Sequence, residues 1–382
     1  MLASPPPFLL SVGSGSKRSP VFRRKAFLNF LLNNDNFLFL LTSIFLSSIL
    51  KSTDNTSRKA GISMKRLSKE EFQRIRHWVY LFARHLDITR WQYWFENGSR
   101  EAVADALRVY QNSDGGFGHG LEPDNMNPNS SPFPTFMAWE ILQEVGCGSK
   151  NHPMIQDIMR YLENCEYVTD KGCYWAIPSN NEYPCQLWYH FPHRPRFQDV
   201  WPPEAYCNAS LINFILQYYD KDSPMYQKML RIIDYRISFL PQLPVFLKAA
   251  EYDVEHSMEA NDWQHLICLL GRYGLRSHEE CQRLNDQLLE LLMASPYPHV
   301  RDDIQRRIDS GAPNDDPPSQ EELDQMVDRL SHGQSWNQDG LRCQEAECEQ
   351  RMSEMDAGGL WWPINDAIRS LRLLKEAGRI EE

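Results

Sequence analysis

A glycine-rich turn at residues 111–118, with the sequence Gln-Asn-Ser-Asp-Gly-Gly-Phe-Gly, constrains the fold of this chain more than any other segment. Amphipathic helical sequence precedes the turn, and another helical pattern begins about 17 residues later. Glycine lets the backbone turn where a β-carbon would clash, and Asp114 can accept hydrogen bonds from the turn's own N–H groups. The segment therefore predicts a compact joint between two helices, with Phe117 as its apolar anchor.

Apolar residues recur at helical spacing along most of the chain after residue 64. This periodicity predicts helices over residues 69–86, 100–111, 135–145, 152–165, 205–219, 251–270 and 365–377. Gly146 and Gly378 are expected to end the helices that precede them. Because no alternating apolar run is long enough to indicate a sheet, the predicted fold class is all-α.

The glycine turn recurs at regular spacing. A related turn contains Gly172, 57 residues after Gly115, and a Gln-Asp-Gly sequence ends at Gly340, 225 residues after Gly115. Both separations are close to multiples of about 56 residues, a length that holds two helices and a long loop. Residues 64–382 are therefore predicted to form about five to six helical hairpins, although no copies are visible near residues 228 and 284.

Residues 1–63 differ from the rest of the chain in charge. They hold eight Lys/Arg and two Asp/Glu, a formal charge of +6, whereas the remainder carries −17. Their second apolar run, residues 37–50, is shorter than the roughly 20 residues that a membrane-spanning helix needs. Three interpretations stay open: a signal anchor, an extension that is disordered or structured, and a mis-assigned start upstream of Met64. Membrane contact is expected only through residues 26–50, if that segment is real.

The acidic body argues against a nucleic-acid partner, because such binding depends on neutralising phosphates with Lys and Arg. Nine cysteines without any Cys-x-x-Cys pair predict mostly free thiols and a cytoplasmic protein. No metal site and no cofactor are expected.

Three ionisable residues directly follow the glycine turn, in the sequence His119-Gly120-Leu121-Glu122-Pro123-Asp124. A turn needs neither the histidine nor the closely spaced carboxyl groups. In an apolar surrounding, one carboxyl could be kept protonated by desolvation and by its neighbour's charge, which is how a general acid is made. His119, Glu122 and Asp124 are therefore the candidate catalytic residues, with helix capping or arginine binding as the alternative for the two carboxyls.

Aromatic side chains make up 12% of the chain, which favours an aromatic-lined interior or groove. Such rings can stabilise a cation or stack on sugar rings, although most of them are expected to serve packing. The candidate substrate-binding residues are Phe117, Trp139, Trp175, Trp188, Tyr189, His190 and Trp201.

Residues 111–118 resemble the repeat motif Q-x-x-D-G-G-[FW]-G of the terpenoid cyclases and protein prenyltransferases. Residues 134–142, Pro-Thr-Phe-Met-Ala-Trp-Glu-Ile-Leu, are similar to the start of an inner helix in that superfamily. The resemblance implies an α/α toroid, in which an inner ring of helices is surrounded by an outer ring. It is good over residues 100–146, weaker over 152–219 and 335–379, and absent over 220–310.

The catalytic signatures of the superfamily are missing from this chain. An Asp-x-Asp-Asp motif is not found, nor is the Asp, Cys and His set that binds zinc in prenyltransferases. The chain more closely resembles uncharacterised bacterial toroid proteins with the extended motif D-G-G-F-G-H-x-L-E-P-D. Three functions stay open: acid–base chemistry on an isoprenoid or other apolar substrate, a carbohydrate-active hydrolase or lyase, and a scaffold that binds a ligand without catalysis.

Overall fold

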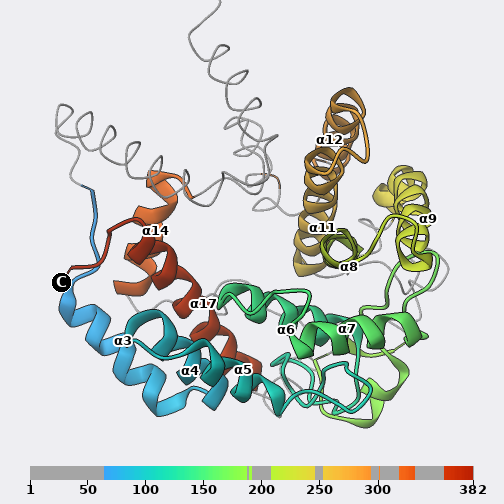
Figure 1. The fold of residues 1–382 in the computed structure, drawn as a ribbon. Helices are drawn as coiled ribbons and strands as arrows, with labels where there is room; N and C mark the ends of the chain where they lie inside the picture. The colour runs from blue at the N-terminus through green and yellow to red at the C-terminus, as the bar shows by residue number, and fades with distance from the viewer. Residues whose placement is uncertain are drawn as a thin grey trace, which may run out of the picture. The chain divides into compact units, whose positions relative to one another are not determined.

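The structure, a computed structural model, describes residues 64–186, 189–191, 208–245, 253–293, 301, 318–331 and 357–381. Residues Lys65–Glu382 belong to one compact unit. Over the described residues the secondary structure is helical, and strand pairing is confined to isolated bridges. The prediction of an all-α class is confirmed (Figure 1).

Eleven α-helices and two short 3-10 helices are described. The α-helices are α3 (Lys69–Phe82), α4 (His85–Phe95), α5 (Arg100–Arg108), α6 (Pro132–Glu144), α7 (Pro153–Asn164), α8 (Asn208–Tyr218), α9 (Pro224–Phe239), α11 (Asp253–Arg272), α12 (His278–Leu292), α14 (Gln320–Ser331) and α17 (Ala357–Glu376). The 3-10 helices are η1 (Pro178–Glu182) and η3 (Leu240–Gln242).

The prediction of one helix over residues 69–86 is wrong in one respect. Helix α3 ends at Phe82, and a second helix, α4, begins at His85. Ser68 caps α3 through a hydrogen bond from the Glu71 N–H to its hydroxyl, as its sequence position indicates. Ala83 and Arg84 then adopt extended backbone conformations, which end α3 and separate it from α4. The aromatic residues at 91–95 therefore form the second half of a helix.

The helix boundaries at glycine are confirmed, whereas two helix starts lie earlier than predicted. Gly146 and Gly378 follow α6 and α17 with φ angles of 72° and 67°, the left-handed conformation that glycine adopts at low cost. Helix α6 begins at Pro132, because proline is tolerated in a first helical turn. Helix α17 begins at Ala357 and contains Pro363.

Residues 220–310, where no copy of the repeat motif is visible, also contain long helices. Helix α11 packs against α8 on one side and α12 on another, and Figure 1 shows α11 and α12 side by side. Ser277 and Glu280 form a reciprocal capping box at the start of α12. Helical periodicity therefore persists where the glycine turn is lost.

Helices α4, α6, α8 and α11 contact one another in chain order. Arg90 of α4 forms an ion pair with Glu144 of α6 at 2.6 Å. The Trp139 indole of α6 donates to the Tyr218 hydroxyl of α8 at 3.1 Å. Helix α8 in turn packs against α11.

The two ends of the compact unit meet. Helix α17 packs against α3 and α4. The Leu67 N–H donates to the Arg379 carbonyl at 2.8 Å, and the Glu381 N–H donates to the Leu67 carbonyl at 2.9 Å. Helices α3 and α17 are thus joined by packing, and the residues just before α3 and just after α17 by backbone hydrogen bonds.

Within the described part of the chain, no helix combines the length and the apolar character needed to cross a membrane. The apolar runs of residues 26–32 and 37–50 lie outside the described residues.

Candidate functional site

The glycines of the turn are required by close packing. A β-carbon on Gly115, whose φ is 98°, would lie 2.2 Å from the Asp157 carbonyl oxygen. A β-carbon on Gly116 would lie 2.6 Å from the Ser130 β-carbon. Asp114 accepts hydrogen bonds from the Gly116 N–H at 2.9 Å and from the Ser130 hydroxyl at 2.8 Å. These contacts give the turn a structural role, joining the segment after α5 to the segment before α6.

Phe117 and Trp139, two of the predicted substrate-binding residues, belong to the hydrophobic core. Phe117 is fully buried, and its N–H donates to the Thr135 hydroxyl at 3.0 Å. Trp139 is buried and packs edge-on against Phe214, with ring centroids 5.5 Å apart. Both side chains are therefore engaged in packing.

His119 lies in a different environment from the two carboxyl groups that follow it. Its side chain is exposed, and its ring Nε2 lies 2.8 Å from the Asn112 side-chain oxygen. Its backbone is left-handed, with a φ of 56°, and its N–H donates to the Asn127 carbonyl. The structure gives His119 a place in the turn and no recorded contact with Glu122 or Asp124.

Glu122 and Asp124 form a buried pair, called here the carboxyl pair. Their exposed fractions are 1% and 8%. The Asp124 N–H donates to Glu122 Oε2 at 2.9 Å, and the Trp362 indole N–H donates to Asp124 Oδ2 at 3.0 Å. Asp124 Oδ1 has no hydrogen-bond partner among the described residues. One oxygen of Asp124 is thus oriented by Trp362, while the other can accept or deliver a proton.

Burial raises the pKa of both carboxyl groups. The pKa of Asp124 rises to about 6, because desolvation outweighs the hydrogen bond from Trp362. The pKa of Glu122 rises well above its usual range, first through burial and then through the charge of Asp124. Hydrogen bonds from the Asp124 N–H and from Tyr189, together with the charge of Arg84, only partly offset this rise. Each carboxyl group therefore holds its proton more tightly than it would in water.

The loop that carries the carboxyl pair is fixed by buried amide side chains. Asn127 Nδ2 donates to the Asn180 side-chain oxygen at 2.8 Å, and Asn180 Nδ2 donates to the Tyr189 carbonyl at 2.9 Å. The Gln186 N–H donates to the Asp124 carbonyl at 2.8 Å. Satisfied buried networks of this kind hold one conformation, so the pair is preorganised.

Arg84, in the break between α3 and α4, anchors the segment just before Glu122. Its Nη1 donates to the carbonyls of Gly120 and Leu121 at 3.0 and 2.9 Å. Its guanidinium also lies over the Trp361 ring, 5.0 Å from the centroid. Arg84 and the two tryptophans at the start of α17 thus flank the carboxyl pair.

A second set of buried charges continues from Arg84 and is called here the Arg90 network: Arg84, Asp87, Arg90 and Glu144. Arg84 pairs with Asp87 at 2.8 Å, and Arg90 pairs with Asp87 at 3.4 Å and with Glu144 at 2.6 Å. Burial opposes ionisation of Glu144, but the charge of Arg90 and hydrogen bonds from Arg90 and Trp94 outweigh it and lower the pKa of Glu144. In this network each buried carboxylate faces an arginine.

Three predicted aromatic or histidine side chains lie near the loop after α7. Trp175 stacks on Tyr189 with ring centroids 5.0 Å apart, and Phe133 packs against Trp175 at 4.2 Å. Tyr189 is buried and contacts Glu122 through its hydroxyl. His190 is partly buried. The predicted residues Trp188 and Trp201 lie outside the described residues.

Sequence reasoning missed Arg84, Trp361 and Trp362. The Trp361–Trp362 doublet before a helical pattern is visible in the sequence, but its proximity to Asp124 requires tertiary structure. Among the residues that the structure describes, no three His, Cys, Asp or Glu side chains are grouped so as to hold a metal ion. The six described cysteines are free thiols.

Comparison with known proteins identifies no relative. No family model matches the chain. The search of curated proteins finds no match. The search of solved structures likewise finds none.

Proposed function

We propose that this chain is an α/α-toroid enzyme that uses Asp124 as a general acid or base on an isoprenoid or other apolar substrate, or on a carbohydrate. The observation that carries the proposal is the Asp124 carboxyl group. It is buried, its pKa is raised to about 6, one oxygen is bound by the Trp362 indole, and the other lacks a partner among the described residues. A pKa near the working pH suits a group that must both give and take a proton.

The toroid is supported by the order of helix contacts. Helices α4, α6, α8 and α11 contact one another in chain order, and α17 returns to pack against α4. The helices between them, α5, α7, α9 and α12, would then form the outer layer. A ring of alternating inner and outer helices accounts for both the hairpin repeat and the meeting of the two ends.

Glu122 supports Asp124 in this proposal and is not the group that meets the substrate. It is almost completely buried, and it accepts hydrogen bonds from the Asp124 N–H and from Tyr189. Because burial and the charge of Asp124 both favour the protonated form of Glu122, two adjacent negative charges are disfavoured when Asp124 ionises. His119 is exposed and bound to Asn112, so we assign it to the turn.

An apolar substrate, such as an isoprenoid, is supported by the aromatic side chains around the carboxyl pair. Trp362 contacts Asp124, Trp361 lies over Arg84, and Tyr189 contacts Glu122. Aromatic faces can stabilise a developing carbocation. The resemblance of the glycine turn to that of the terpenoid cyclases agrees with this substrate class.

A carbohydrate is the second candidate substrate, and the pKa of Asp124 favours it. An acid with a pKa of about 6 is matched to protonating a glycosidic oxygen near neutral pH, whereas an alkene requires a stronger acid. The same aromatic side chains could stack on sugar rings. In this case Asp124 would act as the acid of a hydrolase or as the base of a lyase.

The proposal is tested by incubating the intact chain with two substrate panels, one of farnesyl diphosphate, geranylgeranyl diphosphate and squalene, the other of neutral and uronic-acid polysaccharides. Conversion in one panel identifies the substrate class. Asp124→Asn should then lower the rate by about 10²- to 10⁴-fold. Asp105→Asn, on the exposed face of α5, is the matched control and should leave the rate unchanged. Conversion that Asp124→Asn does not reduce, or no conversion in either panel, would contradict the proposal.

A further inference from the structure

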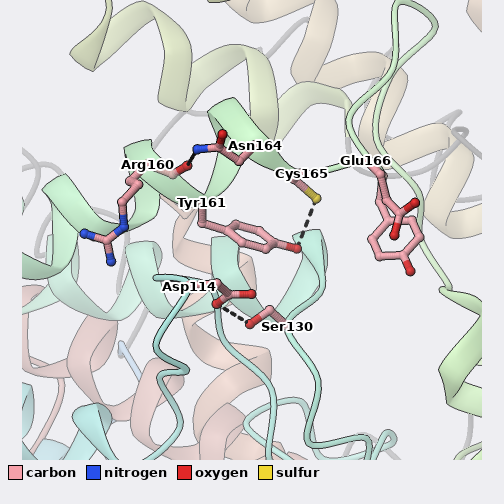
Figure 2. Close-up of a pocket in the computed structure, with 8 residues that line it drawn as sticks. Asp114, Ser130, Arg160, Tyr161, Asn164, Cys165 and Glu166 are labelled. Atoms are coloured by element: carbon pink, nitrogen blue, oxygen red, sulfur yellow. Dashed lines mark hydrogen bonds between the residues drawn. The ribbon is translucent and has the colours of Figure 1, made fainter.

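A cavity of about 450 Å³ lies between the glycine turn and α7, and the proposed acid–base function does not use it (Figure 2). Asp114 lines it from the turn, Ser130 from the loop before α6, and Tyr161, Asn164, Glu166 and Tyr167 from α7 and the residues directly after it. Its volume is within the range of small-molecule sites in proteins. The residues that line it come from three separate segments, which fixes their relative positions.

We infer that this cavity binds a small organic ammonium cation. Its lining includes three side chains with acceptor oxygens, Asp114, Asn164 and Glu166. Asp114 uses Oδ1 for the Gly116 N–H and the Ser130 hydroxyl, and its Oδ2 has no partner among the described residues. Asn164 donates its amide N–H to the Arg160 carbonyl at 2.7 Å, which leaves its side-chain oxygen as an acceptor. An ammonium group supplies the donors that these oxygens lack.

Two tyrosine rings add an aromatic component to the cavity. Tyr161 is 6% exposed, and burial keeps its pKa well above the usual range, so its ring stays neutral. Its hydroxyl lies 3.2 Å from the Cys165 sulfur, which fixes the ring over the turn. Tyr167 forms a hydrogen bond with the Glu166 carboxylate. Neutral aromatic faces beside carboxylates are the combination that recognises organic cations.

Arg160, the cationic side chain among the described residues that line the cavity, does not favour an anionic ligand. Arg160 pairs with Asp157 at 2.7 Å, and its Nη2 approaches the Ser113 carbonyl at 3.5 Å. Figure 2 shows its guanidinium on the side of the view opposite Glu166. Asp114 and Glu166 therefore set a negative charge in the cavity, which attracts a cation.

The test is calorimetric titration of the intact chain with butylammonium, and with n-butanol as an uncharged probe of similar size. Butylammonium should bind and n-butanol should not. Glu166→Gln should weaken butylammonium binding about three- to fivefold, as expected for one partly exposed charge pair. The double variant Asp114→Asn/Glu166→Gln should weaken it at least about tenfold. Asparagine at 114 can still accept from Gly116 and Ser130, so the turn is preserved.

Glu182→Gln is the matched control, because it removes an exposed carboxylate outside the cavity and should leave binding unchanged. Backbone amide NMR shifts of residues 161–167 should move on titration. The inference is overturned if butylammonium does not bind, if n-butanol binds equally well, or if the double variant binds butylammonium like the unmodified chain. None of these outcomes depends on Asp124, so the inference can fail while the proposed function stands.

Discussion

The Arg90 network and the carboxyl pair are both built from buried acidic side chains, but their charges are compensated differently. Asp87 and Glu144 face arginines at 2.6 to 3.4 Å, and the pKa of Glu144 is lowered. Among the described residues, Asp124 is stabilised by the hydrogen bond from Trp362 and Glu122 by hydrogen bonds and the charge of Arg84, and the pKa of each is still raised. Burial alone therefore does not decide whether a carboxyl group is charged.

The comparison indicates that the buried charges of the Arg90 network serve structure, whereas the carboxyl pair is suited to chemistry. A compensated network stays ionised and joins α4 to α6, since breaking it would leave charges unpaired in the interior. Asp124, with a pKa of about 6, can exchange its proton near that pH, which is the property of acid–base groups in enzymes. Arg84 belongs to both regions, because it pairs with Asp87 and also binds the Gly120 and Leu121 carbonyls.

Breaking the Arg90 network should change the stability of the protein more than any other substitution predicted below. Arg90→Met removes the cation that faces both Asp87 and Glu144 and should lower the free energy of unfolding by about 3 to 5 kcal/mol. Urea denaturation of the intact chain measures this change. Arg231→Met is the control, because Arg231 pairs with Asp170 at 3.0 Å on the surface, where a pair contributes about 0 to 1 kcal/mol. Equal effects of the two variants would contradict the compensation argument.

Neutralising Asp124 should change the free energy of unfolding in the opposite direction, by raising it. A pKa raised from 3.8 to about 6 means that the folded state binds the Asp124 proton more tightly than the unfolded state. The resulting stability is present below about pH 4 and is lost as the pH rises through about 6. At about 1.4 kcal/mol per pH unit, the loss approaches 3 kcal/mol.

Asp124→Asn removes this loss, so it should stabilise the protein by up to about 3 kcal/mol at pH 8 and by much less at pH 4. Denaturation at several pH values checks the prediction. A destabilised variant at pH 8, or an effect that does not change with pH, would mean that Asp124 is ionised with adequate compensation.

Removing Arg84 should affect both regions to an intermediate degree. Arg84→Gln deletes the ion pair with Asp87 and weakens the bonds to two carbonyls, so the expected loss of stability is about 2 kcal/mol. The pKa of Glu122 should rise further, because the charge of Arg84 lowers it. Carboxyl NMR titration measures this shift. Arg100→Gln, which removes an exposed arginine from the Gly146 carbonyl, should change neither quantity appreciably.

Removing the Trp362 indole, which orients Asp124, should have the smallest effect of these substitutions. Trp362→Phe removes the hydrogen bond to Oδ2 and should raise the pKa of Asp124 by up to about one pH unit, or about 1 kcal/mol. Trp361→Phe is the matched control, because that ring lies over Arg84. If both substitutions shift the pKa of Asp124 equally, the hydrogen bond from Trp362 is not what stabilises its ionised form.

Much of the fold could be predicted from the sequence because it depends on local patterns. Helical periodicity located most of the described helices, and Gly146 and Gly378 marked two helix ends. The break at Ala83 and Arg84 was missed, since neither residue is a helix breaker and Arg84 is engaged with carbonyls 36 and 37 residues away in sequence. Long-range contacts of this kind leave no periodic signal.

The candidate site was predictable only in part. Glu122 and Asp124 could be identified because a glycine turn has no need of two carboxyl groups next to it. Trp362, which binds Asp124 from 238 residues away, could not be placed without tertiary structure. The different environment of His119 also depends on its own left-handed backbone, with the ring beside Asn112.

The most direct test of the account is a titration of the side-chain carboxyl carbons of Glu122, Asp124 and Glu144 by NMR in the intact chain, with assignment by Asp124→Asn and Glu144→Gln. The account predicts an apparent pKa of about 6 for Asp124, a raised value for Glu122 and a lowered value for Glu144. Ordinary values near 4 for both Glu122 and Asp124 would contradict it, because the carboxyl pair would then hold no proton at neutral pH.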